Sequence, residues 1–212
     1  MRKPSDKRWK RTLALYQHDC AWDTFGSSLA GMDEAGRGPL LGPVVAACVI
    51  MPREPVLPWI DDSKKLTEAQ REAVFGEIVS CALAVGIGEA SVREIDEMNI
   101  LGATRLAMQR AAAAVPAALC LVDAVKNLEL PFPTVPIIHG DAISYSIAAA
   151  SIVAKVSRDR QMAELAGLYP HYGLERNKGY GTAEHIAAIQ RYGACPEHRS
   201  LFIRKFIGEN ER

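Results

Sequence analysis

The sequence lacks the cysteine and histidine patterns that mark zinc sites and redox centres. Its 212 residues include five cysteines and five histidines, and no two cysteines form a C-x-x-C pair. An odd number of cysteines without such spacing indicates free thiols in a reducing compartment. His171, His185 and His198 also lack a short ligand spacing. The sequence therefore gives no support for a zinc site or a disulfide framework.

Signals for membrane insertion and for two common enzyme classes are missing as well. No apolar run reaches the roughly 20 residues that span a bilayer. The basic N-terminus is not followed by an apolar core with a cleavage site. Neither the phosphate loop G-x-x-x-x-G-K-[ST] nor the serine elbow G-x-S-x-G occurs. We therefore expect a cytoplasmic protein without a membrane partner, and neither a P-loop enzyme nor an α/β-hydrolase.

The charge of the chain is balanced overall but uneven along its length. The 25 basic and 25 acidic residues cancel, so net charge does not indicate a nucleic-acid partner. Residues 1–12, however, carry six basic residues against the single acid Asp6, and residues 177–205 also lean basic. Such clusters are either solvated surface or phosphate contacts. On charge alone we favour solvated surface.

Apolar runs and turn signals predict one α/β domain. The order of elements predicts a mixed five-stranded sheet flanked by helices, antiparallel early and parallel later. We expect a basic lead-in at 1–27 and a main domain at 28–212, with a helical C-terminal extension from about residue 169. Strands are predicted at 28–33, 44–51, 82–90, 118–124 and 134–141, and helices from Thr67, from Ser91, and over 99–115, 144–168 and 182–193.

Four carboxylates form the strongest chemical pattern: Asp33, Glu34, Asp123 and Asp141. Three of them directly follow apolar strand-like runs, and strand ends at one edge of an α/β sheet converge. Clustered carboxylates repel one another, and a divalent cation is the usual compensation. Oxygen ligands favour Mg²⁺ or Mn²⁺ over zinc, and four can hold two ions roughly 4 Å apart for phosphodiester hydrolysis. A single strand-end aspartate is more often a turn former, but this set favours metal.

Two geometric points refine this set. Adjacent strand residues point to opposite faces, so Asp33 and Glu34 can share one site only at a bulge or a strand end. Asp159 lies 18 residues beyond Asp141, which is about 27 Å along a continuous helix at 1.5 Å per residue. We therefore exclude Asp159 from the site and expect it to form an ion pair.

The chain resembles the ribonuclease HII family, the bacterial type 2 ribonucleases H. Two of the matching blocks, DEAGRG and AASIVAKVSRD, are highly specific, and the blocks together span almost all of residues 28–206. They are GMDEAGRGPLLGPVVAACV (31–49), DDSKKLT (61–67), LVDA (121–124), GDAISYSIAAASIVAKVSRDRQM (140–162), YPHYGLERNKGYGT (169–182) and HRSLF (198–202).

This resemblance implies a ribonuclease H-like fold and a two-metal site for Mg²⁺ or Mn²⁺. Asp33, Glu34, Asp123 and Asp141 would be both catalytic residues and metal ligands. The implied activity is endonucleolytic hydrolysis of RNA in RNA–DNA hybrids and incision 5′ of single ribonucleotides in duplex DNA, leaving 3′-hydroxyl and 5′-phosphate ends. The implied roles are ribonucleotide removal from DNA and RNA primer removal. We expect a monomer.

The resemblance also implies residues that recognise the substrate. Gly36, Arg37 and Gly38 would read the 2′-hydroxyl, which distinguishes RNA from DNA, because glycine lets the backbone approach a sugar closely. Tyr180 would stack on the sugar that follows, although locally it could equally be a core or turn tyrosine. Phosphate contacts are assigned to Ser63, Lys64 and Lys178, although lone lysines are more often solvated surface.

Three positions depart from the family pattern without removing a metal ligand. Ala124 replaces a usual glycine, His139 a usual lysine and Asn177 a common histidine. His139 could alter the dependence of activity on pH or metal. The related ribonuclease HIII has an extra N-terminal domain and ends its acidic set with glutamate, so type HII fits better.

Two alternatives stay open. One is another two-metal nuclease or phosphoryl-transfer enzyme on the same fold, which would not need the Gly-Arg-Gly segment or Tyr180. The other is a non-catalytic nucleic-acid-binding module, which would gain nothing from acids that face phosphates.

Overall fold

A five-stranded mixed sheet forms the centre of the protein. The computed structural model describes residues 5–22, 28–123, 125 and 128–207. The strand order is β3-β2-β1-β4-β5; β1, β2 and β3 are antiparallel, and β4 and β5 run parallel to β1, as predicted. The strands are β1 (Leu29–Ala35), β2 (Val44–Ile50), β3 (Ala84–Ala90), β4 (Leu119–Asp123) and β5 (Thr134–Ile137).

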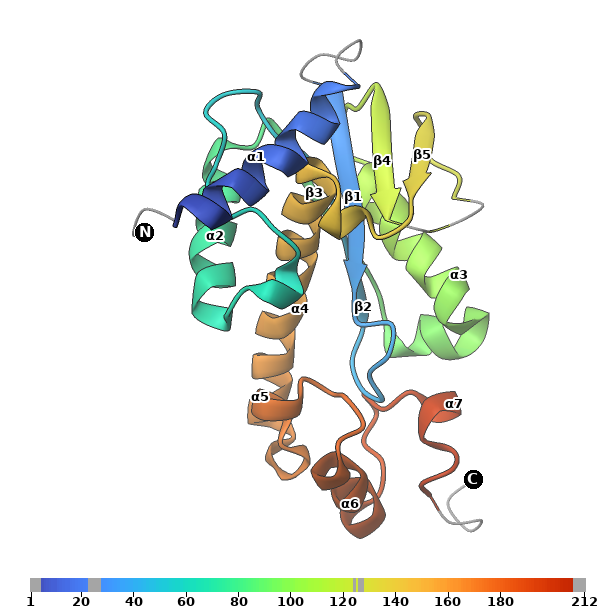
Figure 1. Ribbon diagram of the computed structural model, residues 1–212. Coiled ribbons are helices and arrows are strands. Elements are labelled where there is room, and N and C mark those ends of the chain that lie inside the picture. Colours follow the sequence, from blue (N-terminus) through green and yellow to red (C-terminus); the bar gives the residue numbers. More distant parts are fainter. Residues whose placement is uncertain (1–4, 23–27, 124, 126–127, 208–212) are drawn as a thin grey trace.

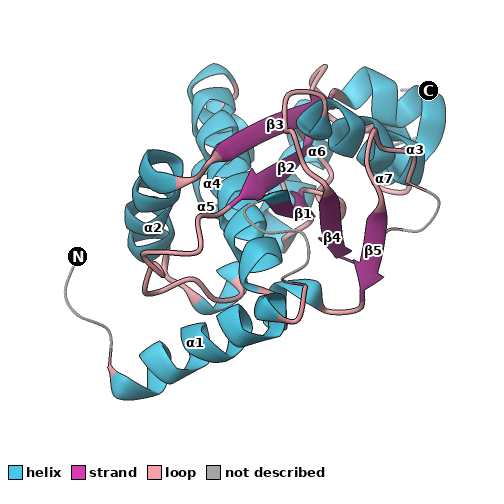
Figure 2. Cartoon of the chain, turned by 90° about the horizontal axis from the view of Figure 1, so that it is seen from above, coloured by secondary structure: helices cyan, strands magenta, loops and turns pink. Residues whose placement is uncertain are grey.

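Helices cover both faces of this sheet. Helices α2 (Glu68–Cys81) and α4 (Tyr145–Leu168) lie on one face and α3 (Val92–Ala112) lies on the other (Figures 1 and 2). Every residue of β2 is buried, and its side chains alternate between the two apolar cores. A buried central strand of this kind is a continuous apolar run, as the sequence of β2 shows.

Close packing of α4 on β1 depends on Gly31. A Cβ atom at this position would lie 2.0 Å from the carbonyl carbon of Ser146, so a larger residue would push the helix away from the strand. Because β1 carries two of the candidate ligands and α4 faces them, this contact determines how closely α4 approaches these ligands.

The predicted helix starts are confirmed. The side chain of Thr67 accepts from the N–H of Gln70, and Ser91 makes the equivalent bond with Glu94, both in complete capping boxes. The two helices predicted after Ser91 form one element, α3, which is interrupted by non-helical backbone at Asn99.

The N-terminal helix α1 (Asp6–Cys20) packs against the α4 side of the domain. Leu15 joins the same apolar core as Tyr145, and the carboxylate of Asp19 accepts a 2.7 Å hydrogen bond from the N–H of Ser146. The boundary predicted at residue 27 stays a prediction, since residues 23–27 lie outside the described part.

Short helices follow α4 and form a separate apolar cluster at its far end (Figure 1). This cluster includes Leu40 and Leu41 from the segment after β1, so the extension packs against that segment. None of the described helices is long and apolar enough to cross a membrane. The extension comprises η4 (Pro170–Tyr172), α5 (Leu174–Asn177), α6 (Ala183–Tyr192) and α7 (Ser200–Ile203).

Candidate functional site

Three of the predicted acids meet at the carboxyl end of the parallel strands. Asp33 lies near the end of β1, Asp123 ends β4, and Asp141 lies in the 3₁₀ helix η3 (Gly140–Ala142). One carboxylate oxygen from each lies within 4.8 Å of the other two. The strand predicted at 134–141 was too long: β5 ends at Ile137, and His139 adopts a left-handed φ of 56° before η3.

Glu34 lies beside this group but is oriented differently. Its Oε1 atom accepts from Nη1 of Arg37 at 3.3 Å, whereas its Oε2 atom is buried and has no hydrogen-bond partner among the described residues. Asp33 and Glu34 both line the same pocket, although β1 keeps regular pairing with β2 at these positions. The parallel pairing of β1 with β4, however, ends at Met32, so both acids lie beyond that pairing and reach one pocket without a bulge.

The negative charges of the site repel one another. Burial raises the pKa of Asp33 well above its usual range, and the negative charges of Glu34 and Asp123 raise it further. Burial also raises the pKa values of Glu34 and Asp123. The ammonium of Lys64 lies 3.0 Å from Oδ2 of Asp141.

This donor set fits a divalent cation. Among the described residues, the four carboxylates form ion pairs with two cations, Lys64 and Arg37, and the buried Oε2 atom of Glu34 has no partner. Oxygen-only donors of this kind suit hard cations such as Mg²⁺ and Mn²⁺.

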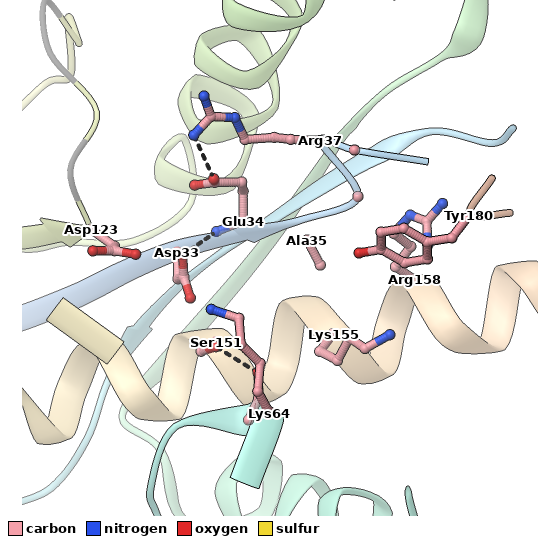
Figure 3. Close-up of a pocket in the computed structure, with 13 residues that line it drawn as sticks. Asp33, Glu34, Ala35, Arg37, Lys64, Asp123, Ser151, Lys155, Arg158 and Tyr180 are labelled. Atoms are coloured by element: carbon pink, nitrogen blue, oxygen red, sulfur yellow. Dashed lines mark hydrogen bonds and ion pairs between the residues drawn. The ribbon is translucent and has the colours of Figure 1, made fainter. Parts of the chain in front are cut away.

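The segment after β1 forms the second part of the pocket. Gly36, Arg37 and Gly38 line it together with Tyr180, whose ring edge would lie 3.7 Å from a Cβ atom at Gly38. Gly36 has a φ of 96°, which favours glycine. Figure 3 shows Asp33, Glu34 and Asp123 at one end of the pocket and Tyr180 with Arg158 at the other. The structure thus brings three of the four predicted metal ligands and the predicted 2′-hydroxyl-recognition segment, residues 36–38, into one pocket of about 240 Å³. The fourth ligand, Asp141, lies close to Asp33 and Asp123 but is not part of the pocket lining.

The three predicted phosphate contacts have different surroundings. Lys64 lines the pocket and its side chain is 79% exposed. Ser63 also lines it, but its hydroxyl is buried and lies 2.9 Å from the hydroxyl of Ser151. Lys178 lies outside the pocket lining and contacts Glu68 at 3.2 Å.

Two of the three departures from the family pattern can be placed. The amide of Asn177 is buried and bridges the turn before Tyr180: it donates to the carbonyl of Tyr172 and accepts from the N–H of Gly179. His139 precedes η3. Ala124 lies outside the described residues.

Sequence reasoning missed three pocket residues on α4: Ser151, Lys155 and Arg158. Their spacing of four and then three residues places them on one face of a helix that starts just after Asp141, and this signal could have identified them. The prediction for Asp159 is confirmed, because it is buried and pairs with Lys155 at 2.5 Å.

Comparisons with known proteins agree with one another. The model of the ribonuclease HII family matches residues 30–207. A ribonuclease HII of Geobacillus kaustophilus is 54% identical, covering 98% of this chain and 80% of its own length. One from Geobacillus thermodenitrificans is 56% identical, covering 97% and 80%.

Solved structures of related ribonucleases share the fold. Ribonuclease H2 of Pyrococcus horikoshii superposes with a TM-score of 0.71 at 25% identity, over 84% of this chain and 96% of its own. A Bst-RNase HIII in complex with Mn²⁺ superposes with a TM-score of 0.63 at 19% identity, over 90% of this chain and 66% of its own.

Proposed function

Because the chain belongs to the ribonuclease HII family, and is thus an endoribonuclease that cleaves the RNA strand of RNA–DNA hybrids, we propose that it also incises duplex DNA immediately 5′ of a single ribonucleotide. The products would be 3′-hydroxyl and 5′-phosphate ends. One observation carries this proposal: three carboxylates of the cluster, the Gly36–Gly38 segment and Tyr180 share a single pocket. Cleavage and recognition of a lone 2′-hydroxyl can therefore act on neighbouring nucleotides. The cellular roles that follow are ribonucleotide and primer removal from DNA.

The acids would hold the metal ions of the reaction. Asp33, Glu34, Asp123 and Asp141 are the proposed ligands of two divalent cations, Mg²⁺ or Mn²⁺. Such ions activate a water molecule and stabilise the leaving oxygen in phosphodiester hydrolysis. The Mn²⁺ complex of the structurally similar RNase HIII supports this assignment.

The chain itself holds these ligands in place before any ion binds. The N–H of Gly140 donates to Oδ1 of Asp123 at 2.8 Å, and the N–H of Glu34 donates to Oδ1 of Asp33 at 2.8 Å. Lys64 offsets part of the negative charge at Asp141. The two backbone contacts restrict Asp33 and Asp123, which line the pocket, so little reordering of these two is needed when the site is loaded.

The remaining pocket residues would bind and orient the nucleic acid. Gly36, Arg37 and Gly38 would contact the 2′-hydroxyl, and the exposed ring of Tyr180 would lie against the next sugar. Lys64 and Lys178 would contact phosphates. The hydroxyl of Ser63 is buried and could donate to a phosphate only while it accepts from Ser151, so we expect its contribution to be the smallest.

Mapping of the cut tests this proposal. The protein is incubated with Mg²⁺ or Mn²⁺ and with three duplexes of one sequence: all-DNA, RNA–DNA hybrid, and DNA with a single ribonucleotide. We expect a unique cut 5′ of the ribonucleotide and an intact all-DNA duplex. Equal cutting of all-DNA duplex would instead indicate a general two-metal nuclease, and binding without cutting would indicate a binding module.

A further inference from the structure

A buried arginine from the C-terminal extension lies behind the Gly36–Gly38 segment. Arg199 is fully buried, and its guanidinium uses all five of its N–H donors on backbone carbonyls of residues 36–43. The bonds range from 2.6 to 3.1 Å. The acceptors are Gly42 for Nε, Arg37 and Pro39 for Nη1, and Gly36 and Pro43 for Nη2.

A second buried arginine, Arg158 of α4, supports the same segment. Its Nε atom donates to the carbonyl of Pro43 and its Nη2 atom to that of Leu41, both at 3.1 Å. Its Nη1 atom donates to the carbonyl of Lys178, just before Tyr180. A Cβ atom at Gly36 would lie 2.2 Å from Nε of Arg158. The glycine is thus required for the close approach of this arginine.

These hydrogen bonds compensate for the burial of the two arginine charges. Among the described residues, no carboxylate forms an ion pair with Arg158 or Arg199. Burial and the nearby charge of Arg158 lower the pKa of Arg199 to about 9, which still leaves it charged at neutral pH. A buried charge is costly unless it is fully hydrogen-bonded. The six carbonyl groups that the two arginines bind in residues 36–43 therefore have to point toward the guanidinium groups.

The inward carbonyls determine where the N–H groups point. In a planar trans peptide the C=O and N–H bonds are antiparallel. Since Arg199 binds the carbonyls of Gly36 and Arg37, the N–H groups of Arg37 and Gly38 point away from it. No described residue accepts a hydrogen bond from either N–H group, and both residues line the pocket.

We propose that Arg199 is a positioning residue for substrate recognition: it holds the peptide planes of Gly36, Arg37 and Gly38 in the orientation that meets a ribonucleotide's 2′-hydroxyl. The proposal rests on the proposed function of this segment as the reader. Arg199 lies in the basic stretch 177–205, for which phosphate contact was one interpretation, but its burial means that it acts only through the backbone.

The test compares two substrates for Arg199→Lys. Lysine keeps the charge but loses the planar fork that binds several carbonyls at once. We expect kcat/KM on the single-ribonucleotide duplex to fall about tenfold or more, and on a continuous hybrid by less than about threefold. A hybrid offers 2′-hydroxyls in many registers, so a loosened reader can still engage one of them; a lone ribonucleotide offers only one register.

Tyr172→Phe is the matched control. It removes a 2.9 Å hydrogen bond to the carbonyl of Gly193 within the same extension, away from the reader segment. The ratio of kcat/KM between the two substrates should remain that of wild type. If Arg199→Lys also leaves this ratio unchanged, the positioning role is overturned.

The wild-type arm separates the two proposals. If the wild-type protein does not cut 5′ of the ribonucleotide, the proposed function fails directly. If it does, and Arg199→Lys leaves the ratio of kcat/KM between the two substrates unchanged, the proposed function stands and the positioning role of Arg199 is overturned. Should Arg199→Lys not fold, Arg158→Lys decides by the same ratio, since it removes two contacts with the same segment.

Discussion

Asp33 shows how a single buried residue of the site lowers the stability of the folded protein. Its side chain is buried next to Glu34 and Asp123, and both burial and these charges raise its pKa. At neutral pH, above its pKa in the unfolded chain, the ionised form therefore costs stability in the folded protein. A bound divalent cation would offset this cost.

Asp33→Asn should therefore separate stability from activity. We expect loss of cleavage, and in metal-free buffer at pH 7 a free energy of unfolding that is higher by about 1 kcal/mol, because the repulsion is removed. Denaturant unfolding with a chelator and a cleavage assay measure the two effects. The exposed Glu129→Gln variant is the control. A fully active Asp33→Asn protein, or one less stable than wild type without metal, would contradict the metal-site assignment.

Helix α3 shows at the scale of an element how one side chain joins two helical segments. Asn99 has a φ of 64° inside α3, and its Oδ1 atom accepts from the N–H groups of Leu101 and Gly102. It therefore caps the second segment in a backbone conformation that few residues tolerate. Before this break, Asp96 accepts from the N–H of Ser200 and so links α3 to the extension.

Substitutions at Asn99 should rank by backbone strain. Asn99→Ala loses the cap and keeps the strained φ, so we expect a loss of about 1–2 kcal/mol in the free energy of unfolding. Asn99→Gly also loses the cap but relieves the strain, and should cost less. Urea denaturation of both variants gives the ranking. An alanine variant as stable as the glycine variant would show that the positive φ is not a constraint.

The stability of the whole molecule depends on how the C-terminal extension packs against the sheet domain. His185 and His198 are buried in this junction with their Nε2 atoms 3.2 Å apart. The N–H of Cys195 donates to Nδ1 of His198, so His198 is protonated on Nε2 and donates to His185; Nδ1 of His185 then donates to the carbonyl of Tyr180. This chain of bonds requires both rings to be neutral.

Acid should therefore weaken this junction. Burial lowers the pKa of His185, and burial together with the charge of His185 lowers that of His198 to about 4. Unfolded histidine titrates near 6.5, so the unfolded chain binds more protons as pH falls. The stability is fully present above about pH 6.5 and falls towards pH 4, by at most about 1.4 kcal/mol per pH unit for each histidine.

Unfolding free energies measured between pH 7.5 and 4.5 test this effect. His198→Gln should flatten the pH dependence, whereas the exposed His171→Gln should leave it unchanged. Equal slopes for wild type and His198→Gln would show that the pair does not titrate on unfolding.

Much of the fold and of the metal site follows from local sequence patterns. The apolar run of β2 and the placement of Asp33 and Asp123 near strand ends follow from the hydrophobic patterns of strands. The capping boxes at Thr67 and Ser91 follow from the need of helix starts for hydrogen-bond partners. Asp141 lies close to Asp33 and Asp123, although its backbone forms a 3₁₀ turn, because a short turn after β5 still delivers the side chain to the same sheet edge.

The sequence alone thus determined the mixed sheet, the acidic cluster and the family. Only the tertiary structure decided which charges are buried and what they bind. Arg199 meets Gly42 across 157 residues of sequence, and no local pattern distinguishes it from a solvated arginine. Local patterns act over a few residues, whereas the environment of a charge depends on segments brought together when the whole chain packs.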